Sequence, residues 1–329
     1  IDTKKFKLLK IMNDEVKNID IIMLSNFDRN AGGRETWLYN FLPELLEDKS
    51  IQRINLFGYT NDEHNNNNIS SASFLGEKKE IEKRLFPVVF KGKQSKYPMA
   101  LAMFNQLKKH KGDNDVSITL AMGVFEMIMM FFIKRFKKTK KVVWLRSIFI
   151  HEKAYAVPKL FRKLLLYIEV YFLRKVDVII CNGDDIRDFY KEFGLNINVI
   201  KNGVKKTKWE LTPPELKSPI NVAYIGRLSQ VKGIESYLEL AKEIKKEETT
   251  LHFIFHIVGD EGVYKEQVNE LVKEGVILNY GVVSNQKLPG FLKGIDVCVA
   301  LTFASDTGGG GGTSNAMLEQ MAASRIMLA

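Results

Sequence analysis

The sequence predicts an α/β protein built from two doubly wound, Rossmann-like domains. Apolar runs of strand length alternate with amphipathic helical patterns along almost the whole chain, which is typical of repeated strand–helix units. Many of these runs are apolar on both faces, such as 176–181, as parallel strands covered by helices on both sides must be. The length of 329 residues also allows two domains with separate cores.

The individual elements follow from these patterns. Strands are expected at 19–25, 53–59, 86–90, 116–121, 141–146, 176–181, 197–201, 220–225, 252–258, 276–280, 296–300 and 325–328. Helices are expected at 34–47, 98–110, 158–175, 184–193, 232–246 and 263–274. The stretch 61–73, which contains four consecutive asparagines, is expected to be a polar loop.

A domain boundary is expected near 205–219, where lysines are followed by three prolines and then a new buried strand. We therefore expect an N-terminal domain at 1–208 and a C-terminal domain at 209–329. The charge supports this division: 1–208 holds 38 Lys and Arg against 24 Asp and Glu, a net of +14, whereas 209–329 has a net of −4. Two such domains facing each other would hold a ligand at the carboxyl ends of both sheets.

The basic N-terminal domain indicates contact with a polyanion. Apolar residues accompany its basic stretches at 97–111 and 127–141, which favours an anionic membrane surface over nucleic acid. No zinc-finger spacing or RNA-binding aromatic signature accompanies the charge, so no nucleic-acid partner is expected. The alternative is a solvated basic surface whose apolar residues turn toward the core.

The composition also limits the kind of protein, its location and the state of its cysteines. No apolar run reaches the roughly 20 residues of a membrane-spanning helix, and the nearest run, 124–133, contains Glu126. The chain begins at Ile1, without a Met or a signal-peptide pattern, so a cytoplasmic protein is expected, whose true start need not be Ile1. Cys181 and Cys298 each end an apolar run and are expected to be buried free thiols rather than a disulfide or metal ligands.

The stretch 226–233 carries the main chemical signal. Gly226 and Arg227 directly follow a buried strand, and Lys232 and Gly233 open a helical pattern. Glycine lets the backbone approach a ligand, a helix N-terminus offers N–H groups, and the two cations neutralise phosphate charge. The pattern therefore predicts a diphosphate site, with an ordinary turn carrying two solvated basic residues as the alternative.

Three further turns are candidates for the same ligand. Gly32 and Gly33 open the first helix, and Gly259 and Asp260 follow the strand at 252–258, where they could contact a base or ribose. A run of five glycines then leads into a C-terminal helix, where an anion could bind the loop and Glu319 a ribose. The candidate residues of this last turn are Thr313, Ser314, Asn315 and Glu319.

Taken together, these motifs resemble the retaining glycosyltransferases of the GT-B fold, in particular glycosyltransferase family 4. The matching segments are 32–33, 201–204, 226–233, 257–260, 288–289 with 296–297, and 318–323. The resemblance implies a nucleotide-diphosphate-sugar donor on the C-terminal domain, with Arg227 and Lys232 on the diphosphate and Glu319 on the ribose. The N–H groups of 313–315 would bind the distal phosphate, and the N-terminal domain would bind the acceptor.

The chain departs from the family pattern in three places. The family's E-x7-E pair would need a glutamate where Gly311 stands, and Asp306 is the expected substitute from the preceding loop. The family's histidine position holds Arg146, so Arg146 is an expected sugar or acceptor contact and His151 a candidate catalytic residue. The family's C-terminal domain also continues beyond the strand at 325–328, so the chain is expected to be truncated.

The predicted function is transfer of a sugar, of hexosyl type, from a nucleotide diphosphate to a glycan, lipid-linked or protein acceptor. Retention of configuration and a role in polysaccharide synthesis are what the resemblance implies. No DxD-type metal pair ends a strand, so we expect no metal and no cofactor, with Arg227, Lys232 and His151 as catalytic residues. The expected location is the cytoplasm, including the inner face of the membrane.

Two other functions compete with this prediction. Gly311 is also compatible with a catalytically silent glycosyltransferase-like protein that binds glycan or supports an active partner. A nicotinamide-dependent dehydrogenase would need G-x-G-x-x-G after a strand, and the first turn at 30–35 lacks that spacing.

Overall fold

The chain divides between Lys201 and Asn202 into two compact units, which we call the N-terminal and C-terminal units. This division lies seven residues before the boundary expected at 208. The computed structural model describes residues 18–25, 27, 33–60, 83–91, 99–110, 116–152, 158–204, 209, 211–247, 251–259, 262–301 and 314–329.

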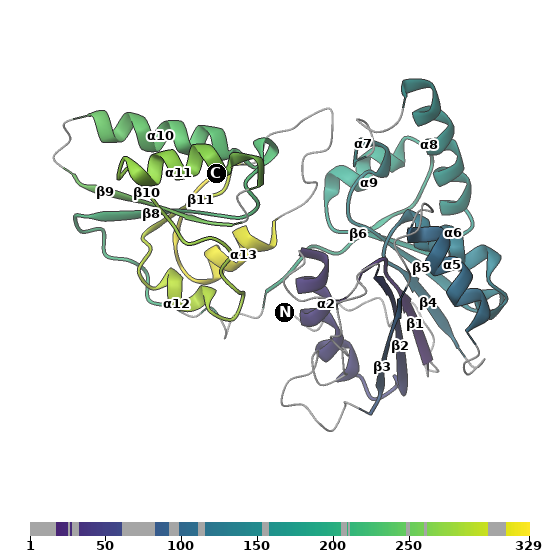
Figure 1. The fold of residues 1–329 in the computed structure, drawn as a ribbon. Helices are drawn as coiled ribbons and strands as arrows, with labels where there is room; N and C mark the ends of the chain where they lie inside the picture. Colours follow the sequence, from purple (N-terminus) through teal and green to yellow (C-terminus); the bar gives the residue numbers. More distant parts are fainter. Residues whose placement is uncertain are drawn as a thin grey trace. The chain divides into compact units, whose positions relative to one another are not determined.

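The N-terminal unit is built on a seven-stranded parallel sheet with the order β3-β2-β1-β4-β5-β6-β7 (Figure 1). Its strands are β1 (Asn18–Ile22), β2 (Arg53–Thr60), β3 (Leu85–Lys91), β4 (Ile118–Ala121), β5 (Lys140–Leu145), β6 (Val178–Cys181) and β7 (Asn198–Val199). The strand order reverses between β1 and β4, which pair in register from Ile19 with Ile118 to Ile22 with Ala121. A crevice for ligand is expected at such a switch point, beyond the carboxyl ends of the strands.

Helices cover both faces of this sheet. They are α2 (Gly33–Leu46), α5 (Met99–Lys109), α6 (Val124–Phe132), α7 (Phe149–Glu152), α8 (Lys159–Leu173) and α9 (Asp184–Lys191), with a 3-10 turn η2 (Lys134–Phe136). Helix α2 packs Trp37, Leu38 and Leu42 on one face, against alternate residues of β1 and β2. Helices α5, α6, α8 and α9 pack on the opposite face, so the sheet is buried on both sides.

The C-terminal unit repeats this plan on a five-stranded parallel sheet with the order β10-β9-β8-β11-β12. Its strands are β8 (Ile220–Ile225), β9 (Phe253–Val258), β10 (Ile277–Asn279), β11 (Val297–Val299) and β12 (Ile326–Leu328). Its helices are α10 (Ile234–Lys246), α11 (Lys265–Lys273), α12 (Leu288–Leu292) and α13 (Asn315–Ala322), with 3-10 turns η4 (Gln230–Lys232) and η5 (Gly262–Tyr264). Helices α10 and α11 cover one face, and α12 and α13 cover the other (Figure 1).

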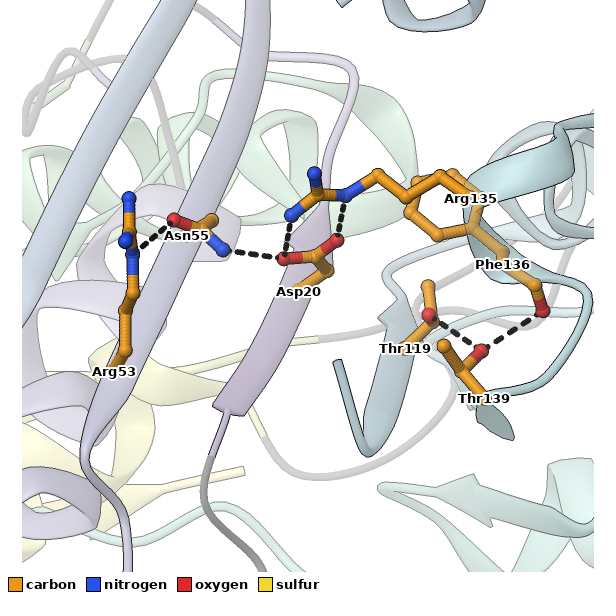
Figure 2. Close-up of polar contacts among 7 residues, drawn as sticks. All are labelled: Asp20, Arg53, Asn55, Thr119, Arg135, Phe136 and Thr139. Carbon is orange, nitrogen blue, oxygen red and sulfur yellow. Dashed lines mark hydrogen bonds and ion pairs between the residues drawn. The ribbon is translucent and has the colours of Figure 1, made fainter. Parts of the chain in front are cut away.

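A buried polar network links β1 to the turn after α6 (Figure 2). Arg135 of η2 binds the carboxylate of Asp20 with two hydrogen bonds, from Nε at 2.5 Å and from its second guanidinium nitrogen at 3.1 Å. Asn55 of β2 donates to the same carboxylate at 2.6 Å and accepts from Arg53 at 3.0 Å. Arg135, the only arginine of the basic run at 134–141, is therefore part of the interior.

The predicted α/β class is confirmed, and every expected strand has a counterpart within a few residues. Helix α6 is not among the predicted helices, because its almost uniformly apolar sequence lacks the polar periodicity of a surface helix. Cys181 and Cys298 are buried and free, as expected. In the part of the chain that the structure describes, every helix falls short of the length and apolarity needed to cross a bilayer.

Candidate functional site

The candidate donor site lies at the carboxyl ends of β8 and β11 in the C-terminal unit. The strand order reverses between these two neighbours, since β9 and β10 lie on one side and β12 on the other. Gly226 and Arg227 follow β8, and the segment after β11 leads to helix α13. Because all the strands are parallel, both turns open at the same edge of the sheet, where α/β proteins bind their ligands.

Gly226 and Gly259 form a close backbone contact at this edge. The Gly226 N–H donates to the carbonyl of Val258 at 2.9 Å, and the Gly259 N–H donates to the carbonyl of Gly281 at 2.9 Å. A Cβ on Gly259 would overlap the carbonyl oxygen of Gly226, whereas one on Gly226 would meet open space. Glycine at 259 is therefore required by packing, and Gly226 leaves room above the strand end.

Arg227 and Lys232 lie within electrostatic reach of each other. Arg227 is exposed and Lys232 is half-buried at the end of η4. Burial lowers the pKa of the Lys232 ammonium, and the neighbouring Arg227 guanidinium lowers it further. Among the described residues, neither cation forms an ion pair with a carboxylate. Two adjacent cations without such a partner are well suited to bind an anion that carries two charges.

Gly233 connects these cations to helix α10. It adopts the left-handed conformation, with φ 69° and ψ 26°, which glycine reaches without steric cost. It thereby ends η4 and serves as the N-cap of α10. The helix begins two residues after the expected start at 232, with Lys232 in η4 and with Ile234, Tyr237, Leu238 and Ala241 buried against the sheet.

Helix α13 contributes the carboxylate of Glu319. This side chain is buried, and Asn285 Nδ2 donates a hydrogen bond to its Oε1 at 2.7 Å. Ser314 occupies the N-cap position, but its side chain makes no capping hydrogen bond, and Asn315 is the first helical residue. Asn285 was not a predicted site residue, although its place in the loop after β10, at a strand's carboxyl end, is a signal that would have identified it.

In the N-terminal unit, the switch point between β1 and β4 is organised by Glu126 of α6. Its Oε1 accepts the N–H of Leu24 at 2.8 Å, and its Oε2 lies so close to Gly123 that a Cβ there would be 2.8 Å away. The carboxyl is fully buried, and burial raises its pKa, opposed by the hydrogen bond from Leu24 and by the charge of Arg34. Glu126 was not a predicted site residue.

The first turn is further shaped by residues of α2. Ser25 Oγ donates to Glu35 Oε1 at 2.6 Å and accepts the N–H of Phe27 at 3.0 Å. Arg34 donates to the carbonyl of Leu24 at 3.2 Å. Gly33 is the first residue of α2, so its backbone is at the helix N-terminus as expected.

The remaining predicted residues are placed as follows. Arg146 directly follows β5 and is half-buried, at the same sheet edge as Leu24 and Gly123. His151 lies on α7, and only its backbone is described. Gly32, Asp260, Asp306, Gly311 and Thr313 lie outside the described residues.

Sequence comparison connects both units to known families. Residues 63–208 match the model described as Glycosyltransferase Family 4, and residues 219–329 match the model described as Glycosyl transferases group 1. The uncharacterized glycosyltransferase MJ1069 of Methanocaldococcus jannaschii is 26% identical over 222 residues, which cover 59% of this chain and 51% of that protein. The chain thus spans about half the length of this curated relative.

Solved structures share the fold at low sequence identity. Sucrose-phosphate synthase from Thermosynechococcus elongatus has a TM-score of 0.68 at 14% identity, over 94% of this chain and 80% of that one. TarM has a TM-score of 0.68 at 15% identity, over 95% and 84%. Anabaena HepE in complex with UDP and glucose has a TM-score of 0.65 at 15% identity, over 95% and 80%. Each unit therefore matches a glycosyltransferase family model, and the chain shares the fold of the GT-B glycosyltransferases.

Proposed function

We propose that this protein transfers a hexosyl group from a nucleoside-diphosphate sugar to an acceptor hydroxyl, with retention of the anomeric configuration. The observation that carries the proposal is the pair of Arg227 and Lys232 beside Gly226, at the switch point of the C-terminal sheet, with Glu319 on the helix that follows β11 in the chain. HepE, a structural neighbour, is described in complex with UDP-glucose, which makes UDP-hexoses the first donors to test.

Each residue has a defined part in this proposal. Arg227 and Lys232 bind the diphosphate and stabilise the charge that grows on it as the bond to the sugar breaks. Glu319, held by Asn285, accepts hydrogen bonds from the ribose hydroxyls. The N–H groups at the start of α13 bind the distal phosphate. The acceptor hydroxyl attacks from the leaving-group side, so the configuration is kept.

Metal independence is part of the same proposal. Two cations at one strand end can supply the charge that a divalent ion supplies elsewhere. Turnover that survives EDTA, with no gain from added Mg²⁺ or Mn²⁺, is the expected result. Loss of turnover with EDTA and recovery with Mg²⁺ would contradict metal independence but not the proposed transfer reaction.

The N-terminal unit is proposed to bind a glycan, lipid-linked or protein acceptor at the carboxyl edge of its sheet. Glu126 contacts Leu24 and Gly123 at this edge, and Arg146 directly follows the neighbouring strand β5. TarM is described with an α-GlcNAc-glycerol and fondaparinux, which supports sugar-bearing acceptors as the class to test. A place in polysaccharide synthesis follows if the accepted molecule is a growing glycan.

Calorimetric titration with UDP, followed by UDP-release assays on a panel of UDP-hexoses, tests the donor site. Arg227→Ala and Lys232→Ala should each weaken UDP binding and reduce turnover by about two to three orders of magnitude, since each removes a group that stabilises developing charge. Lys245→Ala, on the exposed last turn of α10, is the matched control and should behave as wild type. Equal UDP binding by all four proteins would refute the assignment, and the anomeric signal of the product decides retention.

A second candidate function is a catalytically silent member of the family. It is favoured by Gly311, which stands where the family pattern has a glutamate. Such a protein would bind UDP in an Arg227-dependent manner and release none from any donor and acceptor offered. A Gly311→Glu variant that gains turnover over the wild type would identify this state.

A further inference from the structure

Helix α8 carries apolar side chains on the side that faces away from the sheet. On its inner side, the buried residues are Glu169, Val170 and Leu173. Its outer side exposes a stripe at spacings of three and four residues, with Tyr167 70% exposed. The exposed apolar residues are Phe161, Leu164, Tyr167, Ile168 and Tyr171. A surface helix is ordinarily polar on this side, so an apolar outer stripe indicates a contact that the unit itself does not supply.

The same surface continues onto helix α6, which packs beside α8 (Figure 1). Phe172 connects the two helices, with its ring centroid 6.0 Å from that of Phe132 and 5.4 Å from that of Tyr171. Phe132 is 60% exposed at the end of α6. We call this surface, made of the exposed stripe of α8 and Phe132, the α6–α8 face.

Positive charge surrounds the α6–α8 face. Lys134, Lys137 and Lys138 are exposed on and after η2, next to Phe132. Lys163, Arg174 and Lys175 are exposed on and just after α8. The stretches 124–138 and 159–175 contain two carboxylates only, those of Glu126 and Glu169, and both are buried. The exposed part of these stretches is thus apolar and cationic.

We propose that the α6–α8 face docks on an anionic lipid bilayer. Aromatic and aliphatic side chains would enter the interfacial region, and the surrounding lysines would contact lipid phosphates. A second copy of the chain would bring the same positive charges against this face, which disfavours self-association. The proposal concerns a surface separate from the donor site and does not depend on the activity proposed above.

The residues that form the proposed membrane contact differ from those that the sequence predicts. In the basic run, Arg135 is paired with Asp20 and Phe136 is buried, so neither is available for lipid. In α5, Met103 and Leu107 turn into the core. Phe136, Met103 and Leu107 therefore turn toward the core, as the alternative expects, whereas α8, which has no part in the sequence argument for a membrane contact, presents the apolar surface.

Cosedimentation with two kinds of vesicle tests the proposal: phosphatidylcholine alone, and phosphatidylcholine mixed with phosphatidylglycerol. Wild type is expected to bind only the mixed vesicles and to be released by added salt. Lys137→Gln/Lys138→Gln should weaken binding by about fivefold per lysine. Leu164→Ser/Tyr167→Ser should weaken vesicle binding by at least tenfold, because two apolar side chains would no longer insert into the interfacial region of the bilayer.

Matched controls come from exposed positions of the C-terminal unit. Val263→Ser and Lys265→Gln/Lys273→Gln alter an exposed apolar residue and two exposed lysines, and should bind vesicles as wild type does. Unaltered thermal unfolding of every variant shows that the fold is kept. Equal binding by the face variants and the controls, or no binding to either vesicle, would overturn the proposal. The proposal would also be wrong if light scattering detected a dimer that Leu164→Ser/Tyr167→Ser abolishes.

Discussion

Lys232 and Arg227 belong to one short connection between β8 and α10, where burial lowers the pKa of the Lys232 ammonium and the Arg227 guanidinium lowers it further. Like charges at close range cost free energy unless an anion lies between them. In the donor site proposed above, a bound diphosphate would remove this repulsion as well as add attraction.

Arg227→Ala should raise the pKa of Lys232 toward its ordinary value of 10.5, since it removes one of the two causes of the shift. Burial, the larger cause, remains, so the pKa should stay below that value. Titration of the lysine side chain by NMR measures the change. Lys265→Ala, on α11, is the control and should leave the Lys232 titration unchanged.

Glu126 should make stability fall as pH rises above the ordinary glutamate pKa of 4.5. Burial raises its folded-state pKa, so in this window the native state holds a proton that the unfolded chain has lost, and the free energy of unfolding decreases until the raised pKa is passed. Urea denaturation at a series of pH values measures the slope.

Glu126→Gln is the matched variant for that prediction, because an amide oxygen can still accept the Leu24 N–H. It should lose the part of the slope that Glu126 contributes. A pH profile identical to that of wild type would show that Glu126 does not titrate above its ordinary range.

Gly259→Ala should destabilise the C-terminal unit by about 3 kcal/mol, because the new methyl group overlaps the Gly226 carbonyl and forces the strand ends apart. Gly290→Ala is the control: it lies inside α12 with open space around it, and should stabilise by up to about 1 kcal/mol. Thermal unfolding measures both. Equal effects at the two positions would contradict the packing role of Gly259.

Asp20→Asn should cost about 3–5 kcal/mol, since it leaves the buried Arg135 guanidinium without its counter-charge. The double variant Asp20→Leu/Arg135→Met removes both charges and should cost less than Asp20→Asn alone. Urea denaturation of the three proteins tests this order. A double variant less stable than the single one would show that the pair itself is strongly stabilising.

Cys181 and Cys298 should resist thiol reagents in the native protein. Burial raises the pKa of Cys181 to about 11 and that of Cys298 to about 12, so almost no thiolate forms near neutrality. Ellman's reagent should detect no thiol in the described part of the native chain and both after unfolding. Fast labelling of either cysteine without denaturant would contradict the burial of its strand.

The sequence predicted the strands well because their pattern is local. A parallel strand that helices cover on both sides of its sheet needs apolar residues on both faces. The run 220–225 has this pattern, and β8 coincides with it. Helix α6 was harder, because Val124, Met127, Met129 and Met130 are all buried and leave little polar periodicity to detect.

The site was predictable only where its residues are close in sequence. Gly226, Arg227 and Lys232 form one segment with its own signature, whereas the contact of Glu126 with Leu24 joins residues 102 positions apart. Asn285 and Glu319 are 34 positions apart and meet only because β10 and α13 belong to the same folded unit. Sequence patterns can place such residues after the carboxyl ends of strands, but they do not show which of them pair.

The segment from α6 to η2 contacts β1 and the residues after it at two points, through Arg135 at Asp20 in the middle of the strand and Glu126 at Leu24 just beyond it. A one-residue slip of this strand would turn Asp20 to the opposite face and break both attachments together. Two side chains of one segment therefore fix the register of an interior strand of the sheet.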